Sequence, residues 1–403
     1  MEHEMQSGRW SARFWLLWLG GAVLCMAGCG GGSSAMNPPA NPPAPPPPTP
    51  PSSNNSITVS CTPSVMAPGT TSQCSAAMTG VANATFTWSA SAGAITASGL
   101  FTAPSNTGNV TITATDSQNS KDSATENLTV QLKTPASQHV VLVMEENQDY
   151  AGVVGNAAGW PNLNKMMQQG ALSTNYFADV HPSIGNYFML TTGQVLTTND
   201  SSTAVWNVDN VARRLLGANV PFKVYAEGIS QGYLGGNTGN YVIRHNPFAM
   251  LSDVAGSPQV ASQVIQPFSQ FGADVANKAL PEFSFIVPDI MDDAHSGTPQ
   301  QADTWLQTNV VSVLSGMPAF QPGGDGVLIV AFDEAGDTDT THGGGQVAVV
   351  FWGPLAASGY QQKSATVYQH ESLLRTVMDL LSLPNPPGSA ANAPSMAEFF
   401  VQK

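Results

Sequence analysis

Three apolar runs of this chain each end abruptly in acidic residues, and this pattern limits the folds that the chain can adopt. The runs cover residues 140–144, 283–287 and 327–332, each about as long as a buried β-strand. The polar residues that follow them are Glu145, Glu146 and Asn147, then Asp289, Asp292 and Asp293, and then Asp333 and Glu334. In open α/β sheets, ligands and metals bind at the carboxyl ends of parallel strands. The pattern therefore predicts a carboxylate-rich site at one edge of such a sheet.

Charged residues are scarce in the chain, which makes the clustered acids more informative. Asp, Glu, Lys and Arg make up 10% of the 403 residues, and the formal net charge is -14. With only 13 Lys and Arg, the chain lacks the basic surface that nucleic-acid binding needs. We therefore expect no nucleic-acid partner.

Residues 1–29 have the features of an export signal. Arg9 and Arg13 precede an apolar stretch that is too short to span a membrane. That stretch ends in Met-Ala-Gly-Cys, which resembles a bacterial lipobox with Cys29 as the lipidated residue. An ordinary secretory signal is the alternative. Residues 30–56 are rich in Gly, Ser and Pro, a composition typical of a semi-rigid spacer. We expect an exported lipoprotein, held in the cell envelope or outer membrane through its lipid anchor.

Residues 57–132 are predicted to form a small all-β domain. Short alternating runs rich in Thr, Val and Ala are separated by Gly, Pro and Asn, as in a β-sandwich. Cys61 and Cys74 flank a turn signal, so a cross-strand disulfide is expected in an exported protein. Residues 86–89 and 93–104 resemble stretches of bacterial immunoglobulin-like domains, which usually act as stalks or spacers.

Residues 135–403 alternate strand and helix patterns, which predicts an α/β domain with a mostly parallel sheet flanked by helices. The expected strands cover 140–144, 222–226, 283–287, 327–332 and 347–351. The expected helices cover 161–169, 184–190, 303–314 and 370–381.

Ser183 is the candidate nucleophile, because it precedes the helix predicted over 184–190. The free N–H groups and the positive end of a helix stabilise an alkoxide and an incoming phosphoryl oxygen. Asn186, three residues on, would share this face and could donate to a phosphoryl oxygen. The simpler alternative is that Ser183 only caps the helix.

The acidic pairs are candidates for holding a divalent cation. Carboxylate and amide oxygens suit Ca²⁺, Mg²⁺ or Mn²⁺, and Zn²⁺ remains possible. Such an ion lowers the pKa of a nearby hydroxyl and neutralises charge on a phosphoryl group. The expected ligands are Glu146, Asn147, Asp333 and Glu334. A serine beside such a site indicates hydrolytic phosphoryl chemistry.

Several histidines lie close to these motifs in sequence. His295 follows Asp293 by two residues, so a carboxylate can orient or charge it, and we expect it to protonate the leaving group or bind phosphate. His245 is a candidate phosphate ligand, and His342 is a candidate substrate contact in the loop after Asp333 and Glu334. His181 is expected only to shape the serine turn.

Two other hydrolases compete with this interpretation. A Ser-His-Asp esterase would need a G-x-S-x-G turn, and the chain has His-Pro-Ser-Ile-Gly at residues 181–185. That mechanism would also leave the acidic pairs without a role. A two-metal hydrolase without a serine nucleophile is harder to exclude.

Residues 135–403 also resemble a known family: the bacterial phosphoesterases that include acid phosphatases and phosphatidylcholine-type phospholipases C, within the alkaline-phosphatase-like superfamily. The matching stretches are 141–147, 181–187, 223–227, 244–248, 287–289, 293–295, 332–334 and 370–376. They occur in the family's order, over nearly all of this domain.

This resemblance implies an alkaline-phosphatase-like fold and a phosphoserine mechanism. It implies that Ser183 is the nucleophile and joins Glu146, Asn147, Asp333 and Glu334 around the metal, and that Asn186, His245 and His295 surround the phosphate. The loop 337–342 looks closer to the phosphatase branch, which favours phosphate monoesters. The alternatives are a phospholipase C-type diesterase and a catalytically inactive surface-binding protein. The expected partners are a small phosphate ester or phospholipid and, through the anchor, a membrane.

Overall fold

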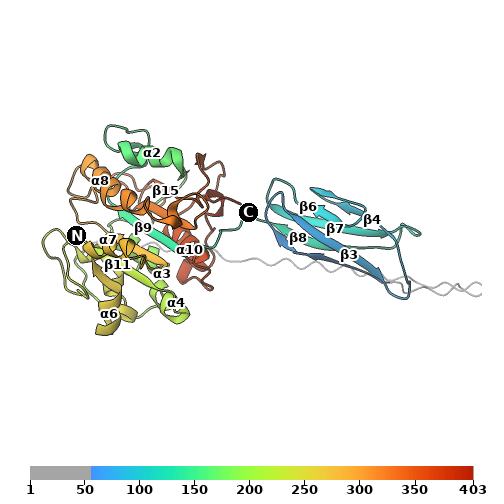
Figure 1. Ribbon diagram of the computed structural model, residues 1–403, viewed down its shortest axis with the longest axis horizontal. Coiled ribbons are helices and arrows are strands. Elements are labelled where there is room, and N and C mark those ends of the chain that lie inside the picture. Colours follow the sequence, from blue (N-terminus) through green and yellow to red (C-terminus); the bar gives the residue numbers. More distant parts are fainter. Residues whose placement is uncertain (1–55, 403) are drawn as a thin grey trace, which may run out of the picture. The chain divides into compact units, whose positions relative to one another are not determined.

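The computed structural model describes residues 56–402 of the chain (Figure 1). The predicted signal with Cys29 and the spacer up to residue 55 lie outside the described residues, so both remain predictions. Within the described residues, none of the helices combines the length and the apolar composition needed to cross a membrane.

Residues 57–130 form two four-stranded β-sheets. One sheet has the order β1-β3-β6-β5 and the other β2-β8-β7-β4. The strands are β1 (Ile57–Thr62), β2 (Val65–Met66), β3 (Thr71–Met78), β4 (Phe86–Ala90), β5 (Ala94–Ile95), β6 (Leu100–Thr102), β7 (Gly108–Asp116) and β8 (Ser123–Val130). Side chains from both sheets, such as Phe101, Ile112 and Leu128, are fully buried between them.

The cysteines of this domain are paired. Cys61 on β1 lies opposite Cys74 on β3 in the antiparallel register, and the two are joined by a disulfide. Trp88 packs against the core between the sheets but is only partly buried. The two sheets agree with the all-β prediction, whereas the likeness to immunoglobulin domains rests on the sequence alone.

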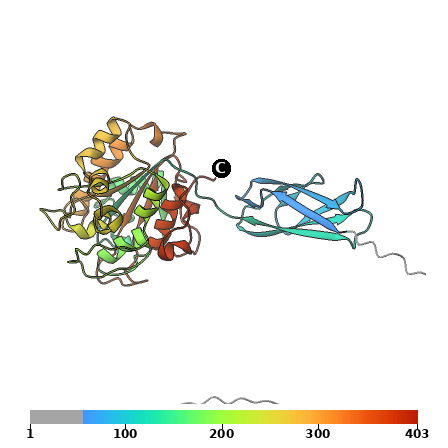
Figure 2. The ribbon, with the colours of Figure 1, turned by 90° about the horizontal axis from the view of Figure 1, so that it is seen from below.

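Residues from 139 onward form one eight-stranded sheet of mixed direction, with helices on both faces (Figures 1 and 2). The sheet order is β12-β11-β13-β9-β14-β15-β10-β16. The strands are β9 (His139–Glu145), β10 (Ala171–Ser173), β11 (Phe222–Ala226), β12 (Ile265–Pro267), β13 (Phe283–Val287), β14 (Gly326–Phe332), β15 (Val349–Trp352) and β16 (Tyr360–Gln361). The neighbouring strands β12, β11, β13, β9 and β14 are parallel to one another. β15 runs antiparallel to both of its neighbours, β14 and β10.

The central strands are buried on both faces, which explains why they are continuously apolar. Every residue of β13 and β14 is buried, as expected for parallel strands covered by helices. The strand predicted over 347–351 is found as β15, which begins two residues later, ends one residue later and runs antiparallel to β14.

Helices pack on the sheet, and four of them begin at a side-chain cap. The α-helices are α1 (Tyr150–Val153), α2 (Pro161–Gln169), α3 (Ile184–Thr192), α4 (Val211–Ala218), α5 (Ser252–Ala255), α6 (Pro258–Val264), α7 (Ser269–Ala276), α8 (Pro299–Leu306), α9 (Ser312–Leu314) and α10 (His370–Leu380). The four with a side-chain cap are α4, α6, α8 and α10. The Asn210 side chain caps α4 by accepting from the Arg213 N–H. The helix predicted over 303–314 is α8, a π-helical turn and α9 in succession. In Figure 1, α2 and α8 lie on one side of β9, and α3 and α4 on the other.

Adjacent parallel strands bring the predicted acids together. β9 lies between β13 and β14, so all three carboxyl ends reach the same edge of the sheet. Just past this edge, the Asp333 N–H donates to the Glu145 carbonyl and the Glu146 N–H to the Asp293 carbonyl. These contacts fix the chain segments that carry the site.

Candidate active site

Ser183 lies at the beginning of α3, at the edge where β9 and β14 end. Its side chain is 2% exposed and does not cap the helix. Its Oγ lies 3.1 Å from Glu146 Oε2 and 3.2 Å from Glu334 Oε1, and a hydroxyl can donate its one proton to either oxygen. The simple capping role is therefore not what the structure shows.

The predicted metal ligands surround this hydroxyl. Glu146 and Asp333 are fully buried, and Glu334 is 3% exposed. The Asn147 N–H donates to Asp333 Oδ1 at 3.2 Å. The Asn147 Oδ1 and Asp333 Oδ2 atoms are buried and accept no hydrogen bond. Buried acceptors of this kind are costly unless something else pairs with them.

Burial raises the pKa of each of these acids, and repulsion by neighbouring carboxylates adds to it. Burial, followed by the charges of Asp333 and Asp293, raises the pKa of Glu146 well above its usual value. Burial and then Glu334 raise the pKa of Asp333 to about 8, and burial raises the pKa of Glu334 to about 7. A group of buried carboxylates with unpaired oxygens matches the needs of a hard divalent cation, so these residues fit the predicted metal.

His245 and Asp293 extend the acidic group. His245 Nε2 is 3.1 Å from Glu146 Oε1, and its Nδ1 is 3.2 Å from Asp293 Oδ2, although neither contact has hydrogen-bond geometry. Ligand atoms of Glu146, His245 and Asp293 lie within 4.8 Å of one another. Burial, and then Arg244, lowers the pKa of His245 well below its usual value. Sequence reasoning did not place Asp293 among the ligands.

Tyr187 and two further histidines hold these groups in place. The Tyr187 hydroxyl donates to Glu146 Oε1 at 2.6 Å, and its ring stacks on His245. His181 Nδ1 lies 2.9 Å from Glu334 Oε2, so His181 does more than shape the turn. His370 Nε2 donates to the Asp333 carbonyl at 2.7 Å. Sequence reasoning assigned no role to Tyr187, although its position one helical turn after Ser183 was a signal.

Asn186 does not present a free amide to a substrate, contrary to the prediction. Its Oδ1 accepts from the N–H groups of Asp179 and Val180, and its Nδ2 donates to the Val180 carbonyl. A weaker contact of 3.4 Å joins Nδ2 to Glu334 Oε2. The side chain therefore positions the loop before Ser183 and the carboxylate of Glu334.

His295 lies beside the site in an arrangement that does not favour the predicted role of general acid. Its Nε2 is 3.0 Å from Arg244 Nη2, and burial, then Arg244, lowers the pKa of its ring. The predicted orientation of the ring by Asp293 is wrong, because Asp293 Oδ1 accepts from the His295 backbone N–H instead.

His342 is not brought to the acidic group. It is an exposed residue whose ring packs on Phe177 at a centroid distance of 4.3 Å. Its chain position after Asp333 and Glu334 suggested proximity, but the intervening loop leads it to the surface.

Asp179 and Glu371 form a second pair of carboxyl groups that predicts a pH effect on stability. Burial, and then the charge of Glu371, raises the pKa of Asp179 to about 8. The folded state thus binds this proton more tightly than the unfolded state does. The protonated Asp179 therefore contributes to the free energy of unfolding. This contribution is fully present below the ordinary pKa of about 4 and is lost as the pH rises through about 8. The substitution Asp179→Asn removes this pH dependence. We therefore expect the melting temperature of the variant minus that of wild type to be roughly 4 °C larger at about pH 9 than at about pH 4. A pH-independent difference would contradict the assignment.

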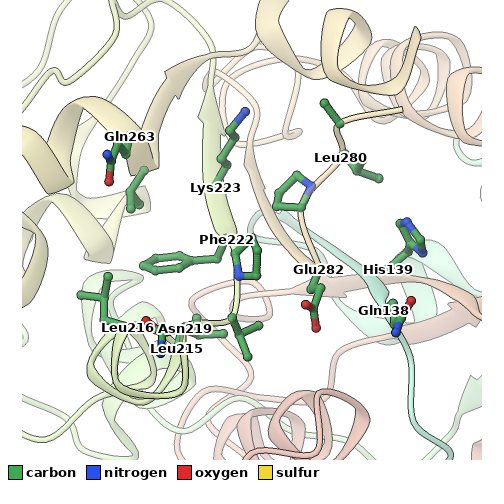
Figure 3. A pocket seen from close by; sticks show the side chains of 15 residues that line it. Gln138, His139, Leu215, Leu216, Asn219, Phe222, Lys223, Gln263, Leu280 and Glu282 are labelled. Carbon is green, nitrogen blue, oxygen red and sulfur yellow. The ribbon is translucent and has the colours of Figure 1, made fainter. Parts of the chain in front are cut away.

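A separate pocket of about 580 Å³ lies at the opposite ends of the strands (Figure 3). Leu215, Phe222 and Leu280 are among its lining residues. Its Lys223 pairs with Asp274, and its His139 with Asp325. Because sites in parallel sheets form at the carboxyl ends, we place the active site at Ser183 and not here.

A sheet edge that gathers a buried serine and a group of carboxylates defines a hydrolytic enzyme. The comparisons with known proteins agree: a model of the Phosphoesterase family matches residues 158–384, and the chain belongs to that family. It is a hydrolase that acts on phosphoester bonds. The matched region contains Ser183, His245, Asp333 and Glu334, while Glu146 and Asn147 precede it.

Three curated proteins illustrate the relationship. The chain is 30% identical over 269 residues to a phosphatidylinositol-3-phosphatase of Mycobacterium tuberculosis, covering 66% of this chain and 84% of that protein. It is 28% identical to a probable acid phosphatase of Kluyveromyces lactis, covering 60% of this chain and 58% of the relative. It is also 28% identical to an acid phosphatase of Aspergillus fumigatus, covering 60% of this chain and 54% of that protein. The chain thus spans little more than half the length of the last two.

Solved structures with a similar arrangement are more distant. One is a protein in the alkaline phosphatase superfamily from Vibrio parahaemolyticus, with a TM-score of 0.44, 12% identity, and coverage of 63% of this chain and 68% of that one. Another is the lipoteichoic acid synthase LtaP from Listeria monocytogenes, with a TM-score of 0.47, 11% identity, and coverage of 67% and 77%.

Proposed function

We propose that this chain is an exported, metal-dependent phosphomonoesterase that uses Ser183 as its nucleophile. The observation that carries the proposal is the buried Ser183 hydroxyl, which points at two carboxylates, Glu146 and Glu334, at the edge of the sheet. The acid phosphatases among its relatives support a monoester substrate. The Mycobacterium tuberculosis relative is named for a phosphoinositide, so a monoester on a lipid is also a candidate.

Glu146, Asn147, Asp333 and Glu334, with Ser183, would hold the divalent cation. When bound, such an ion neutralises the buried carboxylates and lowers the pKa of the serine hydroxyl. The unpaired oxygens of Asn147 and Asp333 support this assignment. We keep His245 as a proposed phosphate ligand on the family resemblance, although its ring nitrogens lie 3.1 Å from Glu146 Oε1 and 3.2 Å from Asp293 Oδ2.

The residues of the chain account for a two-step reaction. Ser183 Oγ gives its proton to one of the carboxylates within 3.2 Å and forms a bond to phosphorus. The bond from phosphorus to the substrate alcohol breaks, and the departing oxygen takes up the proton that the carboxylate received. Water then attacks the phosphoserine, phosphate departs, and the serine oxygen regains a proton from that water by way of the same carboxylate. A phosphoserine intermediate is thus part of the proposal.

The remaining proposals concern where the enzyme works. Export, the lipid anchor at Cys29 and the spacer are proposed from the sequence of residues 1–56. The β-domain over 57–132 would serve as an immunoglobulin-like stalk. Together they would hold the enzyme at the cell envelope, next to a membrane that can contain its substrate.

The test of this function is a comparison of two substrates with the full-length chain. We expect p-nitrophenyl phosphate to be hydrolysed faster than p-nitrophenylphosphorylcholine, and chelator to abolish both rates. A preference for the choline diester would instead support a phospholipase C. Failure to hydrolyse either substrate after metal is restored would contradict the proposal.

A further inference from the structure

Arg244 is set apart from the other cationic side chains by its position beside the active site. Among residues 56–402, four other arginines or lysines are paired with aspartates away from it: Arg213 with Asp253, Arg214 with Asp209, Lys223 with Asp274 and Arg375 with Asp379. Arg244 instead contacts Asp200 and His295, which lie near Ser183. Within residues 56–402, no other arginine or lysine has an ion pair or hydrogen bond to the residues around Ser183. Its side chain is 13% exposed.

The contact between Arg244 and His295 determines which nitrogen of the imidazole ring carries the proton. A guanidinium can only donate, so Arg244 Nη2 donates to His295 Nε2 over their 3.0 Å distance. The ring proton must then be on Nδ1, which lies 3.0 Å from Ser296 Oγ. This tautomer leaves Nε2 with a free lone pair, which accepts from Arg244. His295 is therefore a positioning residue for the guanidinium.

A second contact ties Arg244 to the helix that follows the nucleophile. Arg244 Nε is 3.6 Å from Asp200 Oδ2, and Asp200 Oδ1 accepts from the Ile184 N–H at 3.2 Å. Ile184 is the next residue after Ser183. The Nε atom is buried and makes no hydrogen bond, so its contact with Asp200 is an ion pair alone. Contacts with His295 and Asp200 thus hold the Arg244 guanidinium next to the turn that carries Ser183.

We infer that Arg244 contacts the phosphate of the substrate and selects phosphate monoesters over diesters. This inference rests on the proposed function. A monoester phosphate carries up to two negative charges and three free oxygens, whereas a diester carries one charge and two free oxygens. A fixed guanidinium donates paired, charge-assisted hydrogen bonds to such oxygens. Esterification of a second oxygen removes both an acceptor and a charge, so the contribution of Arg244 is largest for monoesters.

The test is the substitution Arg244→Gln in the full-length chain, with Arg213→Gln as the matched control. We expect kcat/KM for p-nitrophenyl phosphate to fall by about tenfold to a hundredfold, in line with loss of a charge-assisted hydrogen bond. For bis(p-nitrophenyl) phosphate the fall should be smaller, so the ratio of the two rates decreases. Arg213→Gln should leave the ratio unchanged, since Arg213 pairs with Asp253 away from the site.

Inhibitors that are not hydrolysed make the result independent of diester turnover. Phenylphosphonate is a dianion at alkaline pH, and its methyl ester is a monoanion. We expect Arg244→Gln to weaken inhibition by the first more than by the second. Equal weakening, or none, would overturn the inference. A wild type that hydrolyses no monoester would instead contradict the proposed function itself.

Two further variants separate a role in selection from a role in folding. Arg244→Lys keeps the charge but loses the planar fork, so it should retain part of the preference for the monoester. His295→Gln offers an amide oxygen that can accept from Arg244, and it should retain more of the preference than His295→Ala. If both His295 variants lost it equally, His295 would not act by accepting from Arg244.

Discussion

Ser183→Ala should abolish phosphoester hydrolysis while leaving the protein folded. Removal of a nucleophile that acts in concert with its neighbours costs on the order of 10⁴-fold or more in kcat. The hydroxyl is small and buried between two carboxylates, so its loss changes little packing. Initial rates with p-nitrophenyl phosphate, measured beside the melting temperature, give the result.

The chain offers a matched control for this substitution. Ser284 on β13 is also fully buried, and its Oγ makes no hydrogen bond. Ser284→Ala should therefore retain wild-type turnover. Substantial activity in Ser183→Ala would rule out the covalent route, and water activated directly by a metal would then be the better explanation.

Removal of the divalent cation should have the second large effect. Glu146, Asp333 and Glu334 repel one another without a cation, and burial keeps them from water. Chelator should therefore reduce turnover to background and lower the melting temperature, because an ion bound only by the folded state stabilises it. Added divalent metal should restore both.

Asp333→Asn separates the electrostatic and catalytic parts of this prediction. Above about pH 8, where the metal-free Asp333 is ionised, removing its negative charge should make the chelated protein more stable than the chelated wild type. The same change should lower turnover by about a hundredfold or more, since a ligand is altered. Asp209→Asn, at a surface pair with Arg214, is the control and should change neither. A wild type unaffected by chelator would contradict the metal assignment.

The sequence predicted the strands that carry the site well, because the sequence patterns that indicate them are local. Runs 140–144, 283–287 and 327–332 are long enough to indicate buried strands, and the acids directly follow them. β11 and β13 agree with their predicted bounds. β10, β12 and β16 were not predicted, because two or three residues carry no detectable period.

The failures concern side chains whose partners lie outside their own strand, helix or local motif. Asp293 was assigned to the nearby His295, but the fold turns it toward His245, which lies 48 residues earlier in the chain. Asn186 has the right spacing from Ser183, yet its amide is used by the loop at Asp179. Spacing along a helix predicts which face a residue lies on, but not which loop packs against that face.

The central claim is that Ser183 becomes covalently phosphorylated during turnover. The most direct measurement is rapid acid quenching of the metal-loaded full-length enzyme during hydrolysis of p-nitrophenyl phosphate, followed by mass spectrometry of its peptides. We expect one added phosphoryl group, located on Ser183 and absent from Ser183→Ala. Full turnover with an unmodified Ser183 peptide at every quench time, or with phosphate on another residue, would contradict the account.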